Sequence, residues 1–221
     1  MKICIVVGTR PEIIKMSPLI RVCEKKQLDF FVVHTGQHYG HRMSSSIFDD
    51  LDLRKPEHDL DLHSRNHGNR IGLMIHAIGE VLKKEGPDVV FVQGDTNSVL
   101  AGALSARKLA IKIGHHEAGL RSHAPAMPEE TNRIVTDHVA DYLFAPTGSA
   151  MENLRVEGIE ERKIFLTGNT VVDAVKQNLE LAEKRVGLFD RMNITKGVYI
   201  VATAHRAENV DHENRLADII N

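Results

Sequence analysis

Short runs of apolar residues recur along the chain, and each ends in a polar turn that leads into a helical pattern. The first run, Lys2–Val7, is rich in β-branched residues and stops at Gly8, which is typical of a strand buried on both faces of a parallel sheet. Similar runs occur at 30–34, 89–92, before Glu117, at 142–145 and at 163–167. We therefore expect six parallel strands alternating with helices, in a doubly wound, mostly parallel α/β sheet of the Rossmann type.

The end of the chain has a different pattern. A seventh strand-like run, 198–202, leads into a polar segment and then into the start of another helix. Residues 186–221 are too few for a core of their own, because domains below about 40 residues rarely fold alone. We expect an N-terminal doubly wound domain over 1–185 and the truncated start of a second domain over 186–221.

Composition limits the classes of partner. The 28 basic and 30 acidic residues leave a net charge of −2, so no general positive field recruits nucleic acid. The two cysteines, Cys4 and Cys23, lie in the first apolar run and the following helix, as buried thiols do in a reducing compartment. The first run is too short to cross a bilayer and lacks the flanks of a signal peptide. These features predict a cytoplasmic protein without nucleic-acid or membrane partners.

Three carboxylates are candidates for a site at one edge of the sheet. Asp95 and Glu117 each follow a predicted strand, and the carboxyl ends of parallel strands form the edge where ligands bind. Glu129 begins the next helix. An alternative role for Asp95 is to cap the helix that follows it, and an alternative for Glu129 is a surface ion pair with Arg133. Glu117 has no comparable structural role.

Two cations lie near the first strand-to-helix turn. Arg10 lies in the strand-to-helix loop and is therefore expected to point at the ligand crevice. A cation and a helix N-terminus together suit a phosphate. Lys15 belongs either to the same site or to the exposed surface of the helix. The turn at 8–11 matches neither a Walker A loop nor G-x-G-x-x-G, which disfavours ATP and NAD bound in the usual way.

Several histidines raise the question of a metal-dependent hydrolase. Zinc sites often use two ligands spaced to share one helix face. No pair among the candidate histidines has that spacing, and the sequence therefore predicts no metal site. The residues weighed are His38, His115, His116 and His205, together with Asp95 and Glu117.

Seven motifs occur together in the order found in one known family. They are GTRPE at 8–12 with Lys15, TGQH at 35–38, QGDT at 93–96, HHEAGLRS at 115–122, PEETNR at 128–133, TGNTVVDA at 167–174 and HRAEN at 205–209. The chain resembles the non-hydrolysing UDP-N-acetylglucosamine 2-epimerases along essentially its whole length. The resemblance implies the N-terminal half of a glycosyltransferase-B-like architecture, with the active site between two Rossmann-type domains. It also implies that 1–185 is the N-terminal Rossmann-like domain and that 186–221 is the truncated start of the second, nucleotide-binding domain.

The resemblance also implies a reaction at C2 of the sugar, which interconverts UDP-N-acetylglucosamine and UDP-N-acetylmannosamine. The family eliminates UDP across C1–C2, because the C2 proton is not acidic, and adds UDP back to the bound 2-acetamidoglucal. No cofactor or metal is required. The residues that it implies as catalytic are Asp95, Glu117, Glu129 and His205. Those that it implies as substrate-binding are Arg10, Lys15, Asp95, Glu117, Arg133 and His205.

The resemblance also implies properties of regulation and assembly. Gln37 and His38 match the loop that lines an allosteric substrate site in bacterial members, although the segment after them, YGHRMSSS, differs from the bacterial pattern. Relatives are commonly homodimers. The nucleotide-binding Ser-Gly-Gly loop of the second domain is absent, so this chain alone is expected to bind UDP weakly and to turn nothing over.

Three other functions remain open at this stage. A glycosyltransferase of the same architecture would share the nucleotide-sugar clamp but would need one base rather than three carboxylates. A hydrolysing 2-epimerase would release free N-acetylmannosamine, although the unbroken HHEAGLRS and PEETNR segments favour retention of the product as a nucleotide sugar. A nucleotide-sugar binder without catalytic activity would tolerate loss of the carboxylates.

Overall fold

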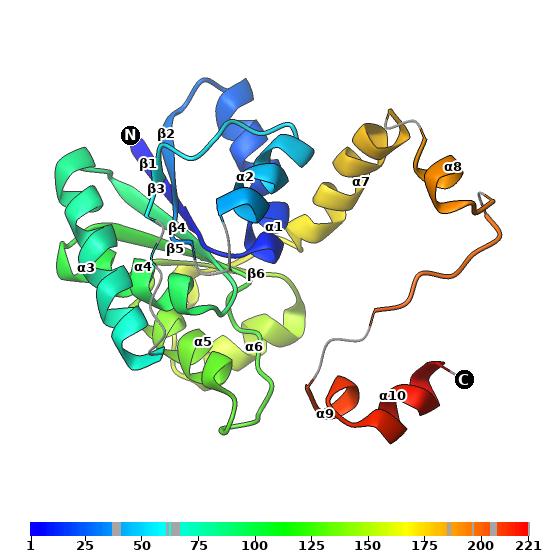
Figure 1. Ribbon diagram of the computed structural model, residues 1–221. Coiled ribbons are helices and arrows are strands. Elements are labelled where there is room, and N and C mark those ends of the chain that lie inside the picture. The colour runs from blue at the N-terminus through cyan, green and yellow to red at the C-terminus, as the bar shows by residue number, and fades with distance from the viewer. Residues whose placement is uncertain are drawn as a thin grey trace. The chain divides into compact units, whose positions relative to one another are not determined.

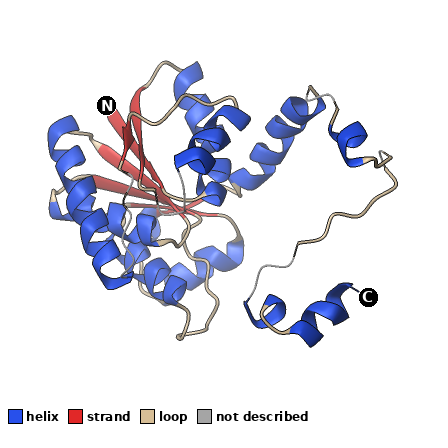
Figure 2. Cartoon of the chain, in the orientation of Figure 1, coloured by secondary structure: helices blue, strands red, loops and turns tan. Residues whose placement is uncertain are grey.

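The computed structural model describes residues 1–36, 41–60, 62, 67–184, 187–195, 197–203 and 207–220. The chain divides into two units, Met1–Leu181 and Ala182–Asn221, and each is described by itself. The chain trace is shown in Figure 1 and its secondary structure in Figure 2.

A sheet of seven parallel strands forms the centre of the first unit within the described residues. The strands are β1 (Lys2–Val7), β2 (Asp29–His34), β3 (His58–Asp59), β4 (Val89–Gln93), β5 (Lys112–His116), β6 (Tyr142–Ala145) and β7 (Ile164–Leu166). The expected doubly wound α/β fold is confirmed. β3 was missed, because a two-residue strand at the sheet edge has no apolar run to reveal it.

Helices cover both faces of this sheet, as Figure 2 shows. The helices up to the unit boundary are α1 (Arg10–Lys25), α2 (His41–Asp50), α3 (His67–Glu85), α4 (Asn97–Lys108), α5 (Pro128–Val139) and α6 (Gly148–Val156), with a short 3₁₀ helix at Glu161–Lys163. α7 (Thr170–Glu183) follows β7 and runs past the boundary at Leu181. α1 and α2 pack on one face through Met16 and Phe48, while α3, α4 and α6 pack on the other through Met74, Val99 and Leu154. No helix among the described residues is long and apolar enough to cross a membrane.

β1 lies near the middle of the sheet and is buried on both sides. Ile3 and Ile5 belong to the apolar cluster beneath α1, whereas Cys4 and Val6 belong to the opposite cluster. This alternation explains why β1 has an uninterrupted apolar sequence. The buried Cys4 thiol has a raised pKa because burial disfavours the thiolate.

The strand order is β3-β2-β1-β4-β5-β6-β7. The chain therefore moves outward from β1 through β2 to β3 and then returns to the other side of β1 at β4. The loops after β1 and β4 leave the sheet in opposite directions at this switch point. A crevice between such loops is the usual ligand site of an open parallel sheet.

The second unit contains the helices α8 (Leu188–Met192), α9 (Ala207–Val210) and α10 (Glu213–Ile220). The prediction of a strand at 198–202 is wrong, since these residues lie in no strand. Val198 and Ile200 are 77% and 94% exposed. A strand forms only where a neighbouring strand pairs with its backbone, and none does so in the described part of this unit. The assignment of 186–221 to a second nucleotide-binding domain stays a prediction.

Candidate active site

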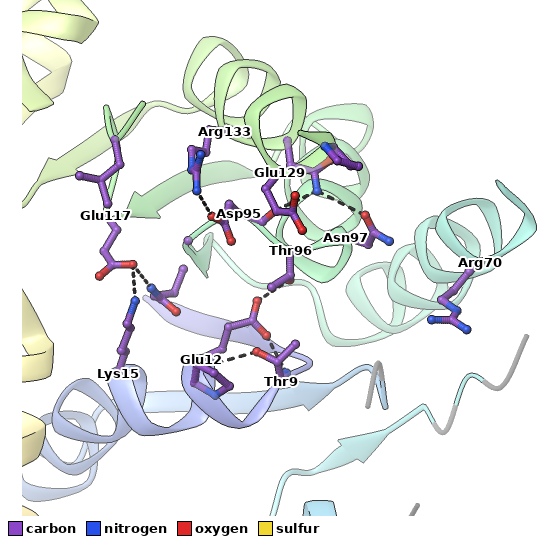
Figure 3. A pocket seen from close by; sticks show the side chains of 16 residues that line it. Thr9, Glu12, Lys15, Arg70, Asp95, Thr96, Asn97, Glu117, Glu129 and Arg133 are labelled. Atoms are coloured by element: carbon purple, nitrogen blue, oxygen red, sulfur yellow. Dashed lines mark hydrogen bonds and ion pairs between the residues drawn. The ribbon is translucent and has the colours of Figure 1, made fainter. Parts of the chain in front are cut away.

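A pocket of about 620 Å³ opens at the carboxyl ends of β1, β4 and β5, next to the strand-order switch. Its walls come from α1, the turn after β4, the loop after β5 and the first turns of α5 (Figure 3). The lining residues are Thr9, Pro11, Glu12, Lys15, Arg70, Gln93, Gly94, Asp95, Thr96, Asn97, Glu117, Leu120, Pro128, Glu129, Asn132 and Arg133. Four acidic and three basic side chains therefore border one space.

Most of the site residues expected from the sequence meet in this pocket. They are Lys15, Asp95, Glu117, Glu129 and Arg133. Arg10, which was expected to point at the crevice, is exposed at the first position of α1 and is not among the lining residues. The other expected residues lie outside the described part of the chain, namely Gln37, His38 and His205.

Glu117 is held at both of its carboxylate oxygens. Lys15 Nζ and Gln93 Nε2 donate to Oε2 at 2.8 and 2.5 Å, and Asn169 Nδ2 donates to Oε1 at 2.8 Å. The side chain of Glu117 is buried. Lys15 is thus part of the pocket wall and not simply helix surface, while Gln93 and Asn169 are contacts that the sequence analysis did not single out.

The backbone of Glu117 is strained. Its φ is 65°, in the left-handed region that residues other than glycine seldom adopt. Two residues later Gly119 also has a positive φ, and a Cβ there would lie 2.2 Å from the carbonyl oxygen of Ala150. The loop after β5 is therefore packed against α6 and turns sharply enough to aim Glu117 into the pocket.

A buried ion network supports this loop. Asp137 on α5 contacts His115 Nδ1 at 2.6 Å and Arg121 at 2.8 Å, and it accepts a hydrogen bond from Gly119 N at 3.1 Å. His115 Nε2 lies 2.8 Å from the carbonyl oxygen of Gly94. Burial opposes the charge on Asp137, but His115 and Arg121 outweigh it and lower the pKa of its carboxyl. His115 and Asp137 thus join the turns after β4 and β5.

Asp95 does not cap α4. The N-cap residue of α4 is Thr96, whose side chain makes no capping hydrogen bond. The Asp95 carboxylate forms an ion pair with Arg133 instead, while Asn132 Nδ2 donates to the Asp95 carbonyl oxygen at 2.8 Å. The alternative role of Asp95 as a helix cap is therefore wrong, and α5 holds Asp95 at the pocket.

Glu129 does not form the surface ion pair that its spacing suggested. Arg133 contacts Asp95 and, at 2.8 Å, Glu130. Glu129 is exposed and, within the described residues, forms no ion pair. Its carboxylate faces the pocket, as Figure 3 shows, where a ligand could reach it.

Glu12 is a fourth pocket carboxylate, and the sequence analysis did not single it out as a site residue. It is 2% exposed. The N–H groups of Gly8 and Thr9 each donate to its Oε2 at 2.7 Å, and Thr96 Oγ1 donates to its Oε1 at 2.5 Å. Burial raises the pKa of Glu12 to about 6 despite these donors. The T-x-x-E spacing of a capping box, directly after a buried strand, is the sequence signal that identifies it.

Metal ligation finds no support among the described side chains. No group of three or more His, Cys, Asp or Glu residues there is arranged to hold a metal ion. His115 is occupied by Asp137 and Gly94, and His116 is buried with a pKa lowered by desolvation.

Comparisons with known proteins relate the chain to one family. The family model described as UDP-N-acetylglucosamine 2-epimerase matches residues 21–221. The UDP-N-acetylglucosamine 2-epimerase of Methanocaldococcus jannaschii is 53% identical over all of this chain and 61% of its own length. The UDP-2,3-diacetamido-2,3-dideoxy-D-glucuronate 2-epimerase of Pseudomonas aeruginosa is 44% identical over all of this chain and 62% of its own length.

Solved structures show the same likeness. The Methanocaldococcus jannaschii enzyme in complex with UDP-GlcNAc and UDP superposes with a TM-score of 0.88 at 53% identity, over 100% of this chain and 61% of that one. The Neisseria meningitidis enzyme bound to UDP-GlcNAc has a TM-score of 0.82 at 33% identity, over 95% and 58%. The chain spans about 60% of the length of the curated relatives that it matches first. By the extent of the family match, this chain belongs to the UDP-N-acetylglucosamine 2-epimerase family.

Proposed function

We propose that the full-length protein is an isomerase that inverts C2 of UDP-N-acetylglucosamine and forms UDP-N-acetylmannosamine. UDP is eliminated across C1–C2, which leaves bound 2-acetamidoglucal, and UDP adds back after C2 is protonated on the opposite face. The observation that carries this proposal is the meeting of Asp95, Glu117 and Glu129 in one pocket, in a member of this family.

Inversion at C2 requires proton transfer on two faces of the ring, and the pocket offers carboxylates from different directions. Asp95 follows β4, Glu117 follows β5, and Glu129 lies on α5. One carboxylate removes the C2 proton and another delivers a proton to the opposite face. Their surroundings differ, because Glu117 has three donors whereas Glu129 has no ion-pair partner in the described part of the chain.

The departing diphosphate needs positive charge close to C1. Pro11 has no N–H, and the N–H groups of Gly8 and Thr9 already donate to Glu12. The start of α1 therefore has few free donors for a phosphate. We assign this task to side chains, namely Arg10, Lys15, Arg133 and His205.

The scheme needs no cofactor, since UDP is both the leaving group and the nucleophile that returns. A homodimer, a cytoplasmic location and activation through Gln37 and His38 complete the proposal. The homodimer and the activation rest on the family resemblance. The cytoplasmic location rests on the two buried, free thiols.

A second candidate function shares the chemistry but changes the substrate. The Pseudomonas aeruginosa relative, 44% identical, is named for UDP-2,3-diacetamido-2,3-dideoxy-D-glucuronate. That sugar carries a second acetamido group and a carboxylate, while the inversion still takes place at C2. The same three carboxylates would serve either reaction.

The test is to incubate the full-length protein with each nucleotide sugar in D₂O, without an acceptor, and to follow C2 by NMR. The proposal predicts solvent deuterium at C2 and formation of UDP-N-acetylmannosamine. Free N-acetylmannosamine would identify a hydrolysing epimerase, and turnover of the diacetamido sugar alone would favour the second candidate. Absence of exchange with both sugars, despite binding, would leave a transferase or a binder and overturn the proposal.

A further inference from the structure

Thr96 is in the position of a helix cap but does not act as one. It is the N-cap residue of α4, yet its side chain makes no capping hydrogen bond. The N-cap threonines of α1 and α6, Thr9 and Thr147, both accept a hydrogen bond from their own helix. The Thr96 hydroxyl instead donates to Glu12 Oε1 at 2.5 Å. A threonine at this position usually stabilises its own helix by capping it. Thr96 instead contacts a residue 84 positions away in the sequence.

Glu12 does more than its capping box requires. In that motif the third helical residue accepts only from the N-cap N–H, here Thr9. Glu12 also accepts from Gly8 N and from Thr96. Unlike a capping residue on a helix surface, its carboxylate is nearly fully buried, in the wall of the pocket. Its raised pKa shows that desolvation opposes its charge, which is common for groups at functional sites.

The contact joins the two turns on either side of the strand-order switch. One turn follows β1 and begins α1, the helix that carries Lys15. The other follows β4 and contains Asp95, directly before Thr96. From the opposite side α5 already fixes Asp95, through Asn132 at its carbonyl and Arg133 at its carboxylate.

We propose that Glu12 is a positioning residue that acts through Thr96 to fix Asp95 relative to the Lys15–Glu117 pair. This inference rests on the proposed function, because it takes Asp95 to be a group that contacts the sugar. Both oxygens of Glu12 accept hydrogen bonds from protein donors, and the donor on Oε1 comes from the residue next to Asp95.

The test compares Thr96→Val with Thr96→Ser in the full-length protein. Valine keeps the shape of threonine but removes the hydroxyl, whereas serine keeps the hydroxyl. We expect kcat for C2 exchange to fall about 10- to 100-fold in Thr96→Val, since small misplacements of catalytic groups have effects of this size. We expect KM to change less than about threefold and Thr96→Ser to restore most of kcat.

Thr147→Val is the matched control, because it removes a capping hydroxyl from a helix outside the pocket. It should lower the melting temperature and leave kcat unchanged. If Glu12 acts through Thr96, the double variant Glu12→Gln/Thr96→Val should be no slower than the slower single variant. Equal kcat in Thr96→Val and wild type, or additive losses in the double variant, would overturn the inference.

The outcome separates this inference from the proposed function. If wild type exchanges C2 hydrogen and Thr96→Val does so equally well, the inference fails while the function stands. If wild type exchanges no hydrogen with either nucleotide sugar, the function fails, and a crystal structure of Thr96→Val decides the inference. The Asp95 carboxylate must then be displaced from its wild-type position, and an unmoved Asp95 refutes the positioning role.

Discussion

Glu129 and Glu130 are adjacent on α5, yet their carboxylates have opposite surroundings. Glu129 is exposed, lines the pocket and has no ion-pair partner in the described part of the chain. Glu130 is buried and accepts hydrogen bonds from the backbone of Ser122 and His123 and from Arg133. Burial alone would raise the pKa of Glu130, but these donors outweigh it and lower the pKa to about 2.

The same contrast separates the pocket from the buried network beneath it. Asp137 is fully buried, and its oxygens contact His115, Arg121 and the backbone of Gly119. A fully buried carboxylate that lines no pocket can hold a loop in place but cannot reach a substrate proton. Carboxylates that line the pocket are therefore expected to affect rate, and those buried away from it to affect stability.

The largest expected effect is the loss of catalysis caused by the substitution Glu129→Gln. We expect kcat/KM in the full-length protein to fall about 10²- to 10⁴-fold, because a general acid or base contributes that much. Unfolding free energy should stay within about 0.5 kcal/mol of wild type, as for other exposed substitutions. C2 exchange assays and urea titrations measure the two quantities. Glu152→Gln on α6, also exposed, is the control, and an equal rate loss there would remove the contrast.

Asp137→Asn should have the largest effect on stability. Removing one partner of a buried ion pair costs about 3–5 kcal/mol, because His115 and Arg121 lose their common anion. Denaturant titration against the exposed substitution Asp88→Asn measures the loss. A change below about 1 kcal/mol would show that the network is not what holds the loop after β5.

Glu130→Gln should change how stability depends on acid. Because the folded-state pKa of Glu130 is about 2 and the ordinary value is 4.5, its contribution is present above pH 4.5 and is lost as pH falls toward 2. Wild type should exceed Glu130→Gln in unfolding free energy by about 2 kcal/mol at pH 7, and the difference should shrink in acid. A difference independent of pH would contradict the structural assignment.

Glu12→Gln should give the smallest change in unfolding free energy, and its dependence on pH should be opposite to that of Glu130→Gln. The folded-state pKa of Glu12 is about 6, above its ordinary 4.5, so the folded state binds the proton more tightly. Its contribution is present below pH 4.5 and is lost as pH rises through 6. Relative to Glu12→Gln, wild type should lose on the order of 1–2 kcal/mol between about pH 4 and 7. Thermal unfolding across this range tests the sign.

Local pattern was sufficient for much of the fold and part of the site. Buried strands such as β1 need apolar residues on both faces, which produces a recognisable run. Thr147 caps α6, as a threonine directly before a helix commonly does. The polarity of parallel strands then places the residues after β4 and β5 on one edge. The joint presence of Asp95 and Glu117 in one pocket follows from that geometry.

Other features have no local signal. β3 is two residues long and is defined only by its pairing with β2. Residues 198–202 have the apolar pattern of a strand, but no described strand pairs with them. β3 is a strand because it forms hydrogen bonds to a distant segment, whereas 198–202 have no such bonds to a strand in the described part of the chain. A single sequence window contains no information about the distant segment.

The sequence by itself determined the alternation of strands and helices, the edge at which the carboxylates gather and the motifs of the family. Only the tertiary structure decided which acidic side chains line the pocket, where a substrate can reach them, and which are buried in contacts with other parts of the protein. Glu129 and Glu130 differ because α5 turns one toward the pocket and the other toward the loop at Ser122. The surroundings of the Glu12 carboxylate likewise include a donor from a distant part of the chain, the hydroxyl of Thr96. The environment of a charged side chain is set by neighbours from distant parts of the chain, and folding alone brings them together.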